Sequence, residues 1–144
     1  MTKTYFEKFS DLNVDFFERA KISLLDPLGL YLANDVKWIK TNQNWNYMKF
    51  PVVIGGKGQP ILLLHGFDSS FLEFRRIYKS LKRNFQVIIP DLLGFGFSPR
   101  CAVNEYNPSK IISYLVDLLK TLKIKDNLKI IGASMGGSTA LKLA

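Results

Sequence analysis

The strongest constraint on the fold is the segment 128–140, where an apolar run leads through two glycines and a serine into a helical pattern. Leu128-Lys129-Ile130-Ile131 has the length of a short buried strand, and Gly132-Ala133-Ser134-Met135-Gly136 follows it directly. So sharp a change from strand to helix strains the backbone at the serine, and glycines two residues before and after it leave the necessary space. The segment therefore predicts a turn that lifts the Ser134 hydroxyl clear of a sheet.

Further strands and helices alternate along the chain before this turn. We expect strands at about residues 47–54, 61–64 and 87–89, and helices after Ser70 and from Asn107 to about residue 122. Ser70-Phe71-Leu72-Glu73 has the pattern of a capping box, and Asn107-Pro108 that of an N-cap followed by proline. This alternation predicts an α/β fold, with a mostly parallel sheet that helices cover on both faces.

Residues 1–33 are expected to form an amphipathic helical extension ahead of a main unit at residues 34–144. Apolar residues recur near helical spacing over residues 5–25, and Asp26-Pro27-Leu28-Gly29 ends that pattern. Such a face usually packs on its own domain. Binding to a membrane surface is the alternative, which the slightly acidic character of the segment disfavours. Residues 34–48 have few periodic apolar positions and are expected to form a loop that leads into a strand.

Charge and composition argue against several functions. The net charge is +8, but the basic residues are scattered or lie between apolar residues at helical spacing, which indicates solvated helix faces and no nucleic-acid-binding surface. The single cysteine, Cys101, excludes an internal disulfide and fits a reducing compartment. No apolar run approaches the length of a transmembrane segment, and the N-terminus lacks the apolar core of a secretory signal. We therefore expect a cytoplasmic protein.

Three segments, in order along residues 61–144, resemble motifs of the α/β-hydrolase superfamily. They are the HG-x oxyanion segment in His65-Gly66-Phe67, the D-x-x-G-x-G-x-S loop in Asp91-Leu92-Leu93-Gly94-Phe95-Gly96-Phe97-Ser98, and the nucleophile elbow in Gly132-Ala133-Ser134-Met135-Gly136-Gly137. Each motif alone is weak, but each here follows an apolar strand. On this resemblance the chain is identified as the N-terminal portion of an α/β-hydrolase fold of the serine-nucleophile branch.

The resemblance implies a role for each of these residues. Ser134 would be the nucleophile that attacks a carbonyl carbon and forms an acyl-enzyme. The backbone N–H groups of Phe67 and Met135 would form the oxyanion hole. The residues that support the motifs would be His65, Gly66, Asp91, Gly132 and Gly136. A serine at this position excludes the branches whose nucleophile is aspartate, namely haloalkane dehalogenases and soluble epoxide hydrolases.

Two of these residues invite other interpretations. His65 is the only histidine, which makes it a tempting catalytic base, but in the family the base comes from a loop after the last strand. Asp91 could be taken for the triad acid, yet in the family that acid follows the nucleophile in chain order.

Gly94-x-Gly96-x-x-Pro99 matches a dinucleotide-binding fingerprint only in part, because Pro99 replaces the third glycine. No metal ion or other cofactor is expected.

The family's fold continues beyond the helix after Ser134, with further strands, a cap and the loops that donate the acid and the histidine. We therefore expect that the chain is truncated inside that helix, that its missing C-terminal half is needed for activity, and that residues 1–144 alone are inactive. Two functions stay open. One is a serine hydrolase of a small carbonyl substrate, with an ester-type or related bond. The other is a non-catalytic binding or scaffold protein of the same fold.

Aromatic residues near the predicted site favour a substrate with an apolar acyl group. They are Phe67, Phe71, Phe74, Phe95 and Phe97. Core packing explains them about as well as substrate binding does.

Overall fold

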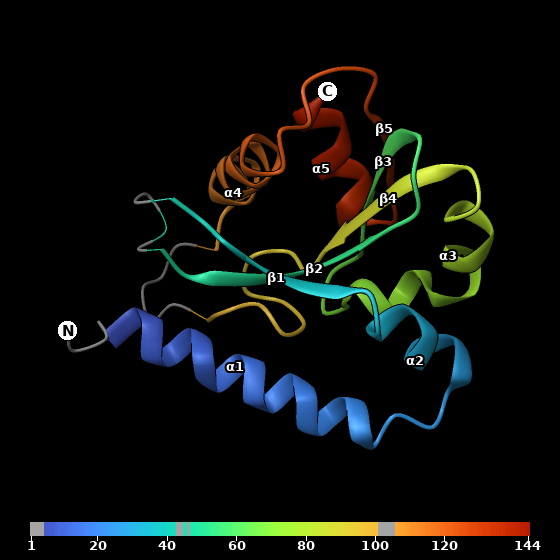
Figure 1. Cartoon of the computed structure of the whole chain (residues 1–144). Coiled ribbons are helices and arrows are strands. Elements are labelled where there is room, and N and C mark those ends of the chain that lie inside the picture. Colours follow the sequence, from blue (N-terminus) through green and yellow to red (C-terminus); the bar gives the residue numbers. More distant parts are fainter. Residues whose placement is uncertain (1–4, 43–44, 46, 101–105) are drawn as a thin grey trace.

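A mixed sheet of five strands forms the centre of the molecule (Figure 1). The computed structural model describes residues 5–42, 45, 47–100 and 106–144, so Cys101 lies outside the described residues. The strand order is β1-β2-β4-β3-β5. The strands are β1 (Val36–Lys40), β2 (Lys49–Gly55), β3 (Gln59–Leu64), β4 (Phe85–Pro90) and β5 (Lys129–Gly132). β3 is parallel to β4 and β5, whereas β2 is antiparallel to β1 and β4, so the expected parallel pairing holds from β4 to β5.

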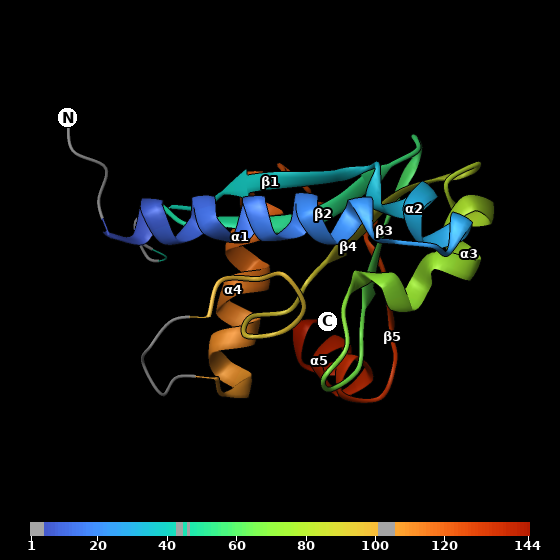
Figure 2. The same ribbon diagram turned by 90° about the horizontal axis from the view of Figure 1, so that it is seen from below.

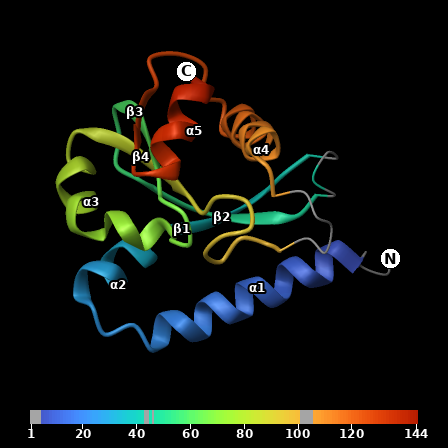
Figure 3. The same ribbon diagram turned by 180° about the vertical axis from the view of Figure 1, so that it is seen from behind.

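Helices cover both faces of this sheet, as the sequence predicts (Figures 1 and 3). One face carries α4 (Pro108–Thr121) and α5 (Met135–Leu143). The other carries α1 (Tyr5–Ile22), α2 (Pro27–Ala33), and α3 (Arg75–Leu81) with the 3-10 turn Phe71–Phe74 before it. In β3 the side chains alternate between the two layers, with Leu62 and Leu64 towards α4 and with Ile61 and Leu63 towards α3. Burial on both faces explains why β3 and β4 are continuous apolar runs.

The N-terminal region differs from the prediction in two respects. Asp26-Pro27 ends the first helix but also begins α2, because the Asp26 side chain accepts the N–H of Leu28 (3.0 Å) and Pro27 is the first helical residue. Residues 34–48 were predicted to form a loop, but residues 36–40 form β1, which pairs with residues 49–53 of β2. β1 is an edge strand that exposes two of its five side chains, so its apolar signal is weak. The division of the chain at residue 33 stays a prediction.

α1 runs beneath β1 and β2 and closes one side of the core (Figures 1 and 2). Phe17 of α1 is only 3% exposed, and its ring centroid lies 6.0 Å from that of Phe71 and 5.1 Å from that of Phe97. The neighbouring Phe16 is 62% exposed. Along the described residues, no helix combines the length and the apolar character that a membrane span requires.

Phe17→Ala is expected to lower the free energy of unfolding by about 3–5 kcal/mol, because it removes a buried ring from the core. Phe16→Ala is the matched control, and it should cost less than about 1 kcal/mol since most of that ring already faces solvent. Urea unfolding of the two variants measures both values. Equal losses would show that α1 does not pack on the core as described.

Candidate active site

The two turns that were predicted to form the site lie next to each other, at the carboxyl ends of β3 and β5. These two strands are parallel neighbours in the sheet, with Leu64 opposite Gly132. The N–H of Ala133 donates to the carbonyl of Leu64 (3.0 Å). A Cβ placed on Gly66 would lie 3.5 Å from the Cβ of Ser134. The turn after β3 therefore touches the serine turn after β5.

Ser134 has the strained backbone that the sequence predicts. Its φ is 50° and its ψ is −117°, a region that residues with a side chain rarely adopt. It is exposed and occupies the N-cap position of α5, yet its side chain makes no capping hydrogen bond. Serine at this position ordinarily uses its oxygen to cap the helix. The strained turn thus leaves the hydroxyl available for chemistry.

Gly132 and Gly136 allow this turn because a side chain at either position would overlap backbone atoms. A Cβ on Gly132 would overlap the carbonyl oxygen of Gly136 and lie 2.5 Å from the nitrogen of Gly137. A Cβ on Gly136 would overlap the carbonyl oxygen of Leu64 and lie 2.6 Å from that of His65. Real Cβ atoms essentially never come so close to other atoms. The first turn of α5 therefore packs directly on the end of β3.

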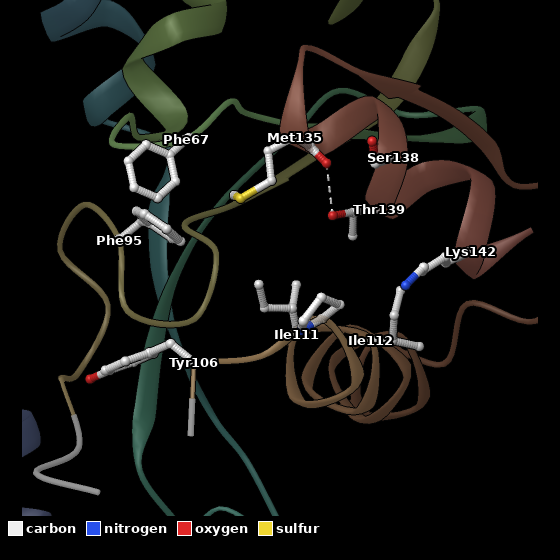
Figure 4. A pocket seen from close by; sticks show the side chains of 10 residues that line it. Phe67, Phe95, Tyr106, Ile111, Ile112, Met135, Ser138, Thr139 and Lys142 are labelled. Carbon is white, nitrogen blue, oxygen red and sulfur yellow. Dashed lines mark hydrogen bonds between the residues drawn. The ribbon is translucent and has the colours of Figure 1, made fainter. Parts of the chain in front are cut away.

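The two residues whose backbone N–H groups the sequence assigns to an oxyanion hole lie on the two adjacent turns. Met135 is the first residue of α5, so its N–H has no partner within the helix and lies at the positive end of the helix dipole. Phe67 follows Gly66 on the adjacent turn, and its side chain is largely exposed. Both residues line one cavity (Figure 4).

This cavity has a volume of about 300 Å³ and opens between α4, α5 and the loop after β4. It is lined by Phe67, Phe95, Tyr106, Pro108, Ile111, Ile112, Met135, Ser138, Thr139 and Lys142. The rings of Phe67 and Phe95 stand edge to face, with centroids 5.4 Å apart, beside Met135 (Figure 4). The Thr139 hydroxyl donates to the carbonyl of Met135 (2.9 Å) and is thereby occupied. The walls are therefore mostly apolar.

The aromatic residues that pointed to an apolar site fall into two groups. Phe67 and Phe95 line the cavity, whereas Phe71 and Phe74 are buried in the core on the other face of the sheet. Phe97 packs on that core as well, stacked on Phe71 with ring centroids 5.7 Å apart. Core packing thus accounts for three of the five.

Asp91 is fully buried and joins the loops after β3 and β4. Its two carboxylate oxygens accept the N–H groups of Phe71 (2.6 Å) and Phe97 (2.7 Å). Its carbonyl accepts the Ser98 hydroxyl (2.9 Å). Burial raises the pKa of Asp91 to about 7, although the two amide donors act in the opposite direction. The Asp91 carboxylate therefore holds the two loops together, and both of its oxygens are engaged in doing so.

His65 is also buried, and both of its ring nitrogens are engaged. Nε2 accepts the N–H of Leu92 (2.9 Å), so the ring proton is on Nδ1, which donates to the carbonyl of Gly66 (2.8 Å). Burial lowers the pKa of His65, which favours the neutral ring. In this arrangement neither nitrogen is free to take a proton from Ser134.

Glu73 makes a contact that the sequence pattern did not predict. Ser70 caps the 3-10 turn through the N–H of Leu72 (3.3 Å), as expected. In a capping box the Glu73 carboxylate would bond the N–H of Ser70, but it instead accepts the N–H of Gly66 (2.9 Å). The capping-box pattern could not predict this partner, because the folded chain brings Gly66 close to Glu73.

Within the described part of the chain, no group of three His, Cys, Asp or Glu side chains could hold a metal ion.

Comparisons with known proteins agree on one family. A family model described as "alpha/beta hydrolase fold" matches residues 59–144. The chain is 37% identical over 89 residues to 2-hydroxy-6-oxo-6-(2'-aminophenyl)hexa-2,4-dienoic acid hydrolase from Metapseudomonas resinovorans, a match that covers 60% of this chain and 30% of that protein. It is 37% identical over 87 residues to Lipase 1 from Psychrobacter immobilis, covering 60% of this chain and 27% of that protein. The chain thus spans less than a third of the length of these curated relatives.

A solved structure shares the same architecture. The meta-cleavage product hydrolase from Pseudomonas fluorescens IP01 is 27% identical, with a TM-score of 0.68, and the match covers 75% of this chain and 39% of that one.

Proposed function

Because the chain belongs to the alpha/beta hydrolase fold family, we propose that Ser134 is the nucleophile of a serine hydrolase. Its hydroxyl oxygen attacks the carbonyl carbon of the substrate, and the N–H groups of Phe67 and Met135 donate to the oxyanion that forms. Departure of the leaving group gives an acyl-enzyme, which water then hydrolyses. The observation that carries the proposal is the strained backbone of Ser134, which is exposed and does not use its hydroxyl to cap α5.

A general base must remove the proton from Ser134, and we propose that it lies outside residues 1–144. His65 is the only histidine in these residues, and its two nitrogens are occupied by Gly66 and Leu92. Asp91 is likewise occupied by two backbone amides. Residues 1–144 on their own are therefore expected to be inactive, and the proposed activity belongs to a longer protein.

The acyl part of the substrate is proposed to be apolar and to occupy the cavity beside Met135. A cavity of about 300 Å³ lies at the small end of ligand sites, so it suits a short or medium acyl chain better than a long one. Two relatives fit such a group by name. One is a hydrolase of an oxo-dienoic acid that bears an aminophenyl group, and the other is a lipase.

The test is a series of p-nitrophenyl esters with acyl chains of two, four, eight and sixteen carbons, given to the whole protein. We expect kcat/KM to rise by up to about fourfold for each methylene that enters the cavity, since burying one contributes about 0.8 kcal/mol. It should fall for the sixteen-carbon ester. Ile112→Phe, which fills the cavity, should shift the optimum to shorter chains.

Ile77→Phe is the control for this experiment, because Ile77 is exposed on α3, whose helix covers the opposite face of the sheet. It should leave the chain-length profile unchanged. A flat profile in the unsubstituted protein, or equal effects of the two substitutions, would contradict the assignment of the cavity to the acyl group.

A further inference from the structure

We propose that Glu73 is a positioning residue that orients the oxyanion hole, an inference that rests on the proposed function. Glu73 lies in the 3-10 turn Phe71–Phe74, seven residues after Gly66. Its Oε2 accepts the backbone N–H of Gly66 at 2.9 Å. That contact places a carboxylate directly behind the turn whose next residue, Phe67, supplies the proposed oxyanion donor.

The direction of the Phe67 N–H depends on two neighbouring peptide units. The first joins His65 to Gly66, and its N–H is held by Glu73. The second joins Gly66 to Phe67, and its carbonyl accepts the Nδ1–H of His65 (2.8 Å). Since a trans peptide is planar, fixing that carbonyl fixes the Phe67 N–H in the opposite direction. The two side chains together hold both sides of Gly66.

Gly66 needs this support because glycine is the residue with the most backbone freedom. Without Glu73, only the contact between His65 and the carbonyl of Gly66 would hold this turn, and the Phe67 N–H would be less firmly aimed at the oxyanion. Donors act best when they are already aimed at the place where charge develops, so a loosened donor costs rate. Glu73 is therefore expected to affect the transition state more than substrate binding.

The turn that Glu73 holds lies beside the nucleophile. A Cβ on Gly66 would lie 3.5 Å from the Cβ of Ser134 and 3.8 Å from Oε2 of Glu73, so both groups lie close to the same side of Gly66. A displacement of Gly66 would therefore also change the surroundings of Ser134.

Glu73 is itself attached to a rigid part of the molecule. Phe71 and Phe74, in the same 3-10 turn, are buried in the core. The N–H of Phe71 donates to the buried carboxylate of Asp91, and the N–H of Glu73 donates to the carbonyl of Ser70 (3.0 Å). The carboxylate therefore extends from a fixed base towards Gly66, and it does not merely cap its own turn.

The test compares Glu73→Gln with Glu73→Met in the whole protein. Gln keeps a carbonyl oxygen that accepts the N–H of Gly66, whereas Met has similar length and no strong acceptor. We expect Glu73→Met to lower kcat about tenfold to a hundredfold with KM within about twofold, and Glu73→Gln to retain most of kcat. Labelling of Ser134 by a fluorophosphonate, and affinity for an arylboronic acid that mimics the tetrahedral intermediate, should fall in parallel with kcat.

Glu18→Ala removes an exposed carboxylate on α1 and should leave all of these values unchanged. Thermal melts of every variant show whether loss of folding explains a loss of rate; if Glu73→Met unfolds, Glu73→Ala replaces it. Unchanged kcat in the variant without an acceptor would overturn the proposal, as would a failure of Gln to rescue in a folded protein. If the unsubstituted protein does not react with the fluorophosphonate at Ser134, the proposed function itself fails, and this proposal fails with it.

Discussion

Ser134→Ala is expected to lower the turnover of p-nitrophenyl esters by the whole protein about a millionfold, the loss typical for removing the nucleophile of a serine hydrolase. The remaining rate would come from substrate binding and the oxyanion donors alone. Steady-state kinetics measure the loss. Ser80→Ala, at an exposed position on α3, is the control and should keep full activity. A loss of less than about tenfold would mean that the nucleophile lies elsewhere.

The same position separates strain from chemistry. Ser134→Gly also lacks the hydroxyl and should be as inactive as Ser134→Ala. Glycine, however, adopts a φ of 50° with a ψ of −117° at little cost, whereas alanine bears the same strain as serine. We therefore expect the free energy of unfolding of the glycine variant to exceed that of the alanine variant by about 1–3 kcal/mol. Urea unfolding of the two variants measures this difference.

Gly136→Ala is expected to cost at least about 4 kcal/mol of stability, a large fraction of what holds a domain of this size together. Its Cβ would overlap the carbonyl oxygen of Leu64 and lie 2.6 Å from that of His65. Both are backbone atoms, so relief requires a shift of α5 against β3. The variant should lose cooperative unfolding or the fold itself, as seen by circular dichroism during thermal melts.

Gly137→Ala is the matched control one residue further along α5. A Cβ there would lie 3.4 Å from the carbonyl oxygen of Gly132, nearly an ordinary contact. Since alanine is the better helix former by about 1 kcal/mol, this variant should be neutral or slightly more stable. Similar stability of the two alanine variants would contradict the close approach of α5 to the end of β3.

The serine turn could be predicted from sequence because its constraints are local. The strain at Ser134 and the close approach of Gly132 to Gly136 arise within five residues, and each leaves a mark on residue type, whereas the contact of Gly136 with Leu64 and His65 comes from the fold. The alternation of strands and helices from β3 to α5 followed from apolar runs. β3 and β4 are buried on both faces, but the strand predicted to be buried before Ser134 is β5, which lies at the edge of the sheet and leaves Ile131 44% exposed. β1 escaped prediction because an edge strand with Lys37 and Lys40 exposed lacks such a run.

Features that depend on distant parts of the chain could not be predicted in the same way. The capping-box pattern identified Glu73 but assigned it to Ser70, because only the folded chain brings Gly66 within its reach. Ile111 of α4 lies on the apolar stripe that packs on the core, and nothing in that pattern distinguishes a core position from a cavity wall. The five phenylalanines near the site divided between core and cavity for the same reason.

The site of a covalent adduct identifies the nucleophile directly. The whole protein would be treated with a fluorophosphonate, digested with trypsin and analysed by tandem mass spectrometry. Cleavage after Lys129 and Lys142 releases residues 130–142, which contain Ser134 and Ser138. We predict one adduct per molecule, on Ser134, and none in Ser134→Ala. An adduct on Ser138 or on another peptide, or equal labelling of the variant, would contradict the assignment of Ser134 as the nucleophile.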